Sequence, residues 1–201
     1  LALDAKKKTL SVADNGIGMN HDDLLETLGT IASSGTQSFV DQLGKEDSKD
    51  VDLIGQFGVG FYSAFMVSKK VEVLTRKAGE DKAWLWTSDG KGEFTIDESK
   101  RDGRGTTVTL HFAKGEDEYL EPARIRNIVK SHSDHIGIPV ILTPSEEGAE
   151  PETLNEASAL WTRTKKDITD EQYKEFYHHV GGGFDEPWMT VHNTVEGVLS
   201  Y

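Results

Sequence analysis

Two glycine-rich segments constrain this chain of 201 residues more than any other feature of its sequence. The first, Asp14-Asn-Gly-Ile-Gly-Met19, ends an alternating stretch, Thr9 to Asp14, that predicts a strand finishing at an acid. The second, Gly55-Gln-Phe-Gly-Val-Gly60, leads directly into an apolar stretch, Phe61 to Val67, that predicts a buried helix. The fold must therefore place one glycine turn after a strand and another before a helix.

The chemistry of these two segments, taken together, fits a nucleotide. A buried carboxylate at Asp14 needs a hydrogen-bond donor, and the exocyclic amino group of a purine would supply one. Gly16 and Gly18 have no Cβ, so the backbone could approach a flat ring closely. At the second segment, uncovered backbone N–H groups at a helix N-terminus suit a phosphate chain. The order of the two segments therefore predicts a nucleotide-binding domain.

Each segment alone has a plainer interpretation. A strand followed by a tight turn needs the same Asp-x-Gly-x-Gly residues. The second segment lacks the βαβ unit and downstream acid of a dinucleotide-binding fold. A calcium loop is excluded because the spaced oxygen ligands and the final bidentate Glu are missing. The seven histidines are scattered along the chain, which favours solvated or core positions over a metal site.

Hydrophobic periodicity predicts further helices and strands. Asn20 is a good N-cap for a helix over 21–29 whose apolar stripe contains Leu24, Leu25 and Leu28. Helices are also expected at 36–43 and 120–136, with a polar loop at 44–52. Alternation predicts an antiparallel meander and one later strand, at 70–76, 83–88, 93–97, 106–112 and 140–143.

A change of composition after residue 144 predicts more than one domain. Residues 145–156 are rich in glutamate and almost without apolar side chains, as in a linker. Thr169 and Gln172 then form a capping box for a helix with a buried stripe of Tyr173, Phe176, Tyr177 and Val180. We predict a nucleotide-binding domain at 1–144, an acidic linker at 145–156 and the start of a second domain at 157–201, which is too short to complete a core alone.

Composition excludes several kinds of partner. A net charge of −13 repels the phosphate backbone, so no nucleic acid partner is expected. No apolar run approaches the ~20 residues that a membrane-spanning helix needs, so no membrane partner is expected. The absence of cysteine excludes disulfides and Cys-ligated metal centres.

Motifs along nearly the whole chain carry a family resemblance. They are Asp14-Asn-Gly-Ile-Gly-Met19, Leu28-Gly-Thr-Ile-Ala32, Ser34-Gly-Thr36, Ile54 to Phe65, Arg104-Gly-Thr106, Ser131 to Pro139, Leu160-Trp-Thr-Arg163, Asp167 to Tyr177 and His192 to Gly197. Together they resemble the heat shock protein 90 chaperones, most closely the bacterial form. The resemblance implies an α+β fold: a two-layer α/β sandwich of the GHKL (Bergerat) ATPase type with a mostly antiparallel sheet, followed by the start of a second α/β domain, the middle domain.

The resemblance also implies an ATP or ADP site. Asp14 would accept a hydrogen bond from the adenine amino group, helped through water by Thr106 and the backbone near Gly18. Apolar side chains would wall the base, the second glycine segment would cradle the phosphates, and residues 33–54 would form a lid. The implied cofactor-binding residues are Asp14, Gly18, Met19, Thr27, Leu28, Ser33, Gly55, Gly58, Val59, Gly60, Phe61 and Thr106.

Two departures and one absence limit what the resemblance implies. Thr27 stands where many relatives carry Asn, and Ser33 where they usually carry Lys. The family's catalytic Glu and the Asn that helps hold Mg²⁺ precede the first motif. We therefore expect no catalytic and no metal-ligating residue in this chain, which begins at Leu1, and we expect a fragment that binds nucleotide weakly without turnover.

For the parent protein the resemblance implies ATP hydrolysis coupled to lid closure and to the folding of client proteins, in a cytoplasmic homodimer. One alternative is a non-catalytic interaction module with a vestigial pocket. Its partner surface would be aromatic, although these side chains are expected to fill the core of the second domain: Trp161, Tyr173, Phe184 and Trp188. A DNA-transacting ATPase of the gyrase B or MutL type is a further alternative, disfavoured by the acidic charge and by Phe61-Tyr-Ser-Ala64.

Overall fold

A computed structural model describes residues 1–29, 58–144, 150–157, 160, 163–181 and 185–192. The chain forms two compact units, Leu1–Glu121 and Pro122–Tyr201. The helix predicted at 36–43, the loop at 44–52 and the lid at 33–54 lie outside the described residues. The domain boundaries predicted at residues 144 and 156 remain predictions.

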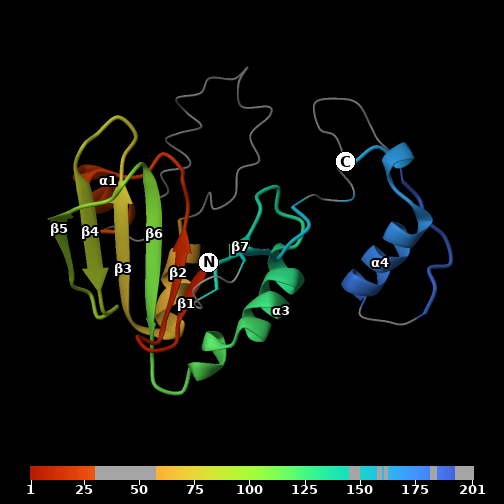
Figure 1. Ribbon diagram of the computed structural model, residues 1–201, viewed down its shortest axis with the longest axis horizontal. Helices are drawn as coiled ribbons and strands as arrows, with labels where there is room; N and C mark the ends of the chain where they lie inside the picture. The colour runs from red at the N-terminus through yellow and green to blue at the C-terminus, as the bar shows by residue number, and fades with distance from the viewer. Residues whose placement is uncertain (30–57, 145–149, 158–159, 161–162, 182–184, 193–201) are drawn as a thin grey trace. The chain divides into compact units, whose positions relative to one another are not determined.

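The first unit contains a six-stranded sheet in the order β1-β2-β6-β3-β4-β5 (Figure 1). Its strands are β1 (Ala2–Asp4), β2 (Thr9–Ala13), β3 (Ser68–Arg76), β4 (Ala83–Ser88), β5 (Phe94–Ser99) and β6 (Gly105–Phe112). All neighbouring strands are antiparallel, which confirms the predicted α+β class and the meander from β3 to β5. Because β6 lies between β2 and β3, the strand that ends before Asp14 pairs with residues far along the chain.

The strands predicted from the alternation of apolar and polar side chains are correct. In β3, Val71, Val73 and Thr75 are fully buried at every second position, while the residues between them are only partly covered. The strands predicted from 9, 70, 83, 93 and 106 onward are confirmed within one or two residues. β1 was not predicted, because three residues are too few to show a period.

Helix α1 (His21–Thr27) follows the Asp14 turn and begins as predicted at Asn20. The Asn20 side chain accepts from the Asp23 backbone N–H at 3.0 Å, and the Asp23 carboxylate accepts from the Asn20 N–H at 2.9 Å. These two bonds form a capping box. Leu24 is completely buried, as expected, but Leu25 is 42% exposed, so the predicted stripe is too wide by one leucine.

The apolar stretch after the second glycine segment is a 3-10 helix, η2 (Gly60–Met66), and the prediction that it is buried is wrong. It has no fully buried residue, and Met66 is 82% exposed. Phe61, Ala64 and Phe65 pack against the core of Leu24, Val71, Val73 and Trp86, so one side of η2 faces the sheet. An apolar composition on all sides therefore did not identify which side is covered.

The second unit begins with α3 (Pro122–Ser133), where Ile125 and Val129 are buried as the periodicity predicted. A two-stranded antiparallel ladder follows, formed by β7 (Ile141–Leu142) and β8 (Glu152–Thr153). β8 falls within the segment predicted to be a linker. Leu154 and Asn155, directly after it, are 4% and 6% exposed, so this part of the segment is packed structure.

Asn155 supports the second unit through its side-chain amide. Its oxygen accepts from the Val140 N–H at 2.7 Å, and its nitrogen donates to backbone carbonyls at 3.0 to 3.4 Å, those of Ser133, Ile136 and Ile138. One buried side chain thereby joins the end of α3 to the β7–β8 ladder.

Helix α4 (Asp170–Gly181) has the predicted capping box. The Thr169 N–H donates to the Gln172 side chain at 3.1 Å, and the Gln172 N–H donates to the Thr169 hydroxyl at 3.3 Å. Val180, which was predicted to be buried, is 67% exposed at the last turn of α4. Trp188, favoured as a core residue, is 95% exposed. No helix in the described ranges is long and apolar enough to cross a membrane.

Candidate functional site

Asp14 lies directly after β2, at the start of the first glycine turn, and its side chain is exposed rather than buried. Its Oδ1 accepts from the Gly16 backbone N–H at 2.8 Å and from the Thr106 backbone N–H at 3.2 Å. Within the described residues, Oδ2 has no hydrogen bond. Two backbone donors therefore orient the carboxylate while one oxygen stays available to another donor.

The glycines around Asp14 are explained by the protein's own backbone. A Cβ on Gly16 would lie 2.9 Å from Asp14 Oδ1, in the path of the turn's hydrogen bond. Gly18 has φ +69°, and a Cβ there would lie 1.9 Å from the Arg76 carbonyl oxygen. Gly105 has φ +116°, and its Cβ would lie 2.2 Å from the Asp14 carbonyl oxygen. The tight-turn interpretation thus accounts for these residues without a ligand.

Thr75, on β3 opposite Thr106, connects this turn to the sheet. Its Oγ1 accepts from the Met19 N–H at 2.9 Å and lies 3.1 Å from the Gly105 carbonyl oxygen. It also lies 3.0 Å from the Thr106 Oγ1. Sequence reasoning missed Thr75, because nothing local to β3 marks it; only the pairing of β3 with β6 brings it to the Asp14 turn.

The three apolar residues predicted to wall the base all pack against the same core. Met19, Leu28 and Phe61 all pack against the core of Leu24, Val71, Val73 and Trp86. The Phe61 ring meets Trp86 edge to face, with 5.6 Å between the ring centroids. The structure thus brings these three residues into one cluster near the Asp14 turn, although they come from three separate segments.

Thr27 uses its hydroxyl within α1. It donates to the Asp23 carbonyl oxygen at 2.6 Å and lies 3.5 Å from the Met19 sulfur. The hydroxyl is therefore engaged by the helix itself, as a threonine inside a helix commonly is. Ser33 and Gly55 lie outside the described residues.

The rest of the second glycine segment is open. Gly58 has φ +64°, Val59 is 53% exposed, and a Cβ on Gly60 would meet nothing within 4 Å. Val59 and Gly60 are exposed and Gly58 is half-buried, and the role predicted for these residues remains a prediction. The helix that follows is a seven-residue 3-10 helix, however, so the argument from the dipole of a long α-helix does not apply.

Charged side chains fix the elements that border the turn. Arg101 donates to the Asp14 carbonyl oxygen at 3.0 Å and to the Thr107 hydroxyl at 2.9 Å, which joins the end of β2 to β6. Lys77 pairs with Asp23 at 2.8 Å, and the hydrogen bond that its ammonium donates to this carboxylate raises the pKa of Lys77. α1 is thereby tied to the end of β3, beside Gly18.

A second charged group lies farther along β3 and β6. Burial raises the pKa of the Glu72 carboxyl, but hydrogen bonds from Lys70 at 2.8 Å and His111 at 2.7 Å outweigh this effect and leave that pKa below its ordinary value. Glu72 is thus held ionised by its two neighbours.

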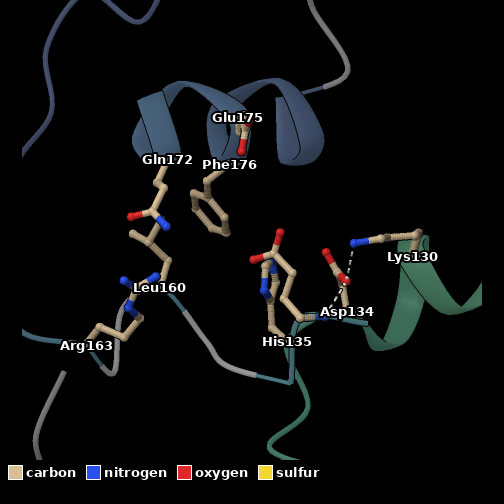
Figure 2. Close-up of a pocket in the computed structure, with 9 residues that line it drawn as sticks. Lys130, Asp134, His135, Leu160, Arg163, Gln172, Glu175 and Phe176 are labelled. Atoms are coloured by element: carbon tan, nitrogen blue, oxygen red, sulfur yellow. Dashed lines mark hydrogen bonds and ion pairs between the residues drawn. The ribbon is translucent and has the colours of Figure 1, made fainter. Parts of the chain in front are cut away.

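Two cavities in the described part of the chain lie away from Asp14. One, of about 480 Å³, borders α1 and β4 and is lined by residues including His21 and Trp84. The other, of about 210 Å³, belongs to the second unit, where the His135 ring lies 5.4 Å from that of Phe176 (Figure 2). Neither cavity is lined by the residues predicted to bind a nucleotide.

The smaller cavity has a side-chain cluster that the sequence did not reveal. Ligand atoms of Asp134, His135 and Glu156 lie within 4.8 Å of one another. Asp134 already accepts from the Lys130 ammonium at 3.0 Å (Figure 2) and from the Glu156 backbone N–H at 3.1 Å. Both bonds end on Asp134 Oδ1, and the ammonium of Lys130 already neutralises the buried carboxylate, so we assign no cation to the cluster.

Comparison with known proteins gives two family matches. Residues 2–114 match the family described as "Histidine kinase-, DNA gyrase B-, and HSP90-like ATPase", and residues 143–201 match "Hsp90 protein". The chain is 61% identical to the Chaperone protein HtpG of Roseobacter denitrificans, 57% to that of Rhodospirillum rubrum and 50% to that of Orientia tsutsugamushi. Each alignment covers 100% of this chain and 31% or 32% of the relative, so the chain spans about a third of the length of these relatives.

Proposed function

The chain belongs to the histidine kinase-, DNA gyrase B- and HSP90-like ATPases, and within them to the HtpG/Hsp90 family; from this premise we propose that it binds an adenine nucleotide at the Asp14 turn. The GHKL type of fold predicted from the motifs is confirmed by this membership. The observation that carries the proposal is the Asp14 carboxylate, which two backbone N–H groups orient while Oδ2 stays available.

The base end of the proposed site combines one polar and one apolar surface. Asp14 Oδ2 accepts from the adenine amino group, and Thr106 and the backbone near Gly18 assist through water. Met19, Leu28 and Phe61 supply the apolar contact for the ring, which their common packing supports. The Asp14 carboxylate is exposed and already oriented by the backbone, so binding a ligand there requires little further ordering of the side chain.

The phosphate end of the proposed site is the second glycine segment. The exposed positions of Val59 and Gly60 support it, and we assign Gly55 and Gly58 to the same cradle. Residues 33–54, with Ser33, form the proposed lid. Thr27 has a positioning role here, since its hydroxyl bonds within α1.

The parent protein is proposed to be an ATP-dependent chaperone. It would couple hydrolysis to lid closure and to the folding of client proteins, as a cytoplasmic homodimer, with ATP and ADP as ligands and Mg²⁺ as the associated ion. We assign no catalytic residue and no Mg²⁺ ligand to the present chain. Its own activity is proposed to be weak nucleotide binding without turnover.

Calorimetric titration of the chain with ADP and Mg²⁺ tests the proposal. Asp14→Asn should weaken binding by about tenfold or more, because the amide replaces a charge-assisted acceptor and can turn a donor toward the adenine amine. Asp22→Asn is the matched control: it removes the same charge from a side chain that is 88% exposed on α1, and it should leave the affinity unchanged. Equal affinities for all three proteins would refute the assignment of Asp14.

An interaction module with a vestigial pocket is a second candidate. Apolar side chains after α4 favour it, since Trp188, Met189 and Val191 are 95%, 65% and 66% exposed. It predicts no ADP binding by the wild-type chain in the same titration. Membership in the HtpG/Hsp90 family leaves the gyrase- or MutL-type alternative without support.

A further inference from the structure

Thr75 is the one fully buried polar residue among the largest completely buried side chains of the described chain, and it lies next to the Asp14 turn. A hydroxyl removed from water destabilises the fold unless it finds hydrogen-bond partners. The two inward positions before it, 71 and 73, are occupied by valine, and a valine at position 75 would fill the same space as the threonine. The hydroxyl therefore distinguishes this position from the rest of the strand.

The hydroxyl can satisfy all three of its partners at once. An OH group has one hydrogen to donate and two lone pairs to accept with. Oγ1 accepts from the Met19 N–H at 2.9 Å, accepts from the Thr106 hydroxyl at 3.0 Å and donates to the Gly105 carbonyl oxygen at 3.1 Å. Its hydrogen-bonding capacity is thus fully used.

These three bonds connect both halves of the proposed base site. Met19 is the first residue after the Asp14 turn and lies in the apolar cluster. Thr106 donates its backbone N–H to Asp14 Oδ1 and accepts from the Asp14 N–H through its carbonyl at 2.8 Å. A change at Thr75 therefore acts on the apolar contact and on the carboxylate together, although Thr75 itself is covered on all sides.

We propose that Thr75 is a positioning residue of the nucleotide site, which sets the place of Met19 relative to the Asp14 carboxylate. This inference rests on the proposed function. Thr75 does not touch the ligand; it acts through Met19 and Thr106. Loss of the hydroxyl removes the partner of the Met19 N–H, and the turn must shift to regain one.

The test compares ADP affinity and stability in the 201-residue chain. Thr75→Val keeps the size of the side chain and removes the hydroxyl, and it should raise the Kd for ADP by about tenfold, the effect of one or two lost hydrogen bonds. Thr75→Ser keeps the hydroxyl and should restore the affinity to within about twofold of the wild type. Thr9→Val is the matched control, since Thr9 is a buried threonine of β2 that makes no bond to Met19 or Gly105.

A role in stability alone would give a different pattern. Affinities are measured well below the midpoint of thermal unfolding of each variant, so that a lower fraction of folded protein does not mimic weaker binding. We expect Thr9→Val to leave the Kd unchanged whatever its effect on the midpoint, whereas Thr75→Val raises the Kd and lowers the midpoint. Wild-type affinity in Thr75→Val would overturn the inference while leaving the Asp14 assignment intact. Absence of ADP binding by the wild-type chain would overturn both.

Thr75→Cys covers the case in which the valine variant does not fold. Cysteine is close in size to the threonine that it replaces, but its thiol is a weak donor and a weak acceptor. It should bind ADP more weakly than Thr75→Ser at comparable stability, and equal affinities for the serine and cysteine variants would contradict the inference.

Discussion

Replacing Gly18 by alanine tests how tightly the Asp14 turn is packed on the sheet. Gly18 has φ +69°, and its Cβ would lie 1.9 Å from the Arg76 carbonyl oxygen and 2.6 Å from the carbonyl carbon. The left-handed conformation alone costs an alanine about 1–2 kcal/mol. The clash is with the backbone of Arg76 at the end of β3, which is paired with Ala83 on one side and Gly105 on the other, and forced overpacking of this kind adds about 1–3 kcal/mol. We therefore expect Gly18→Ala to lower the free energy of unfolding by about 2–5 kcal/mol.

Gly79→Ala separates the two contributions. Gly79 has φ +81°, close to that of Gly18, but a Cβ there would meet nothing within 4 Å. Only the conformational cost of about 1–2 kcal/mol should remain. The difference between the two variants measures the contact with Arg76, independently of the backbone conformation that both glycines share.

Urea unfolding followed by hydrogen exchange of β3 and β6 peptides gives the stability of the first unit by itself. Gly18→Ala should also speed exchange at the end of β3 more than Gly79→Ala does, because the strain is placed on Arg76. Equal losses of unfolding free energy in the two variants would refute the packing argument and leave only the conformational preference of glycine.

Three further predictions concern the core, the acid stability and the second unit. Leu24→Ala should lower the unfolding free energy by about 2–5 kcal/mol and Leu25→Ala by less than about 1 kcal/mol, as measured by urea unfolding, since only the first of these adjacent leucines is buried. Because the pKa of Glu72 is lowered in the folded chain, its contribution to stability is present above the ordinary value of 4.5 and is lost as the pH falls through the lowered pKa; Glu72→Gln should flatten the urea midpoint over that acidic range. Asn155→Asp places an ionised acceptor among three carbonyls and should increase hydrogen exchange at the end of α3, whereas unchanged exchange would show that the amide is not required.

The sequence predicted well what depends on local periodicity. The alternation in β3 and β6 and the capping residues Asn20 and Thr169 each gave the right element, because the signal and the structure involve the same few residues. The prediction was poorer where burial depends on distant partners. The exposed Leu25 is an example, since periodicity alone cannot tell how far a sheet extends over a helix.

In the candidate site, too, the features that depend on local sequence were predicted and those that depend on distant partners were not. The Asp-x-Gly-x-Gly motif located the turn, and the apolar residues assigned to the site pack against one shared core. The sequence did not show that Asp14 is exposed or that Thr75 supports it, because both facts depend on the pairing of β6 with β2 and β3. The glycines were attributed partly to a ligand, whereas the close approach of Arg76 and Asp14 backbone already requires them.

The position of β6 in the sheet also has a consequence for synthesis of the chain. The N–H that completes the binding of Asp14 Oδ1 belongs to a residue 92 positions later. At ~5–20 residues per second, a ribosome needs about 5–20 s to pass from one to the other. During that interval the nascent polypeptide contains the whole Asp14 turn but lacks β6, the strand that pairs with β2 and donates the second hydrogen bond to Asp14. Translation to β6, rather than translation of the motif, therefore sets the earliest moment at which the carboxylate acquires its orientation.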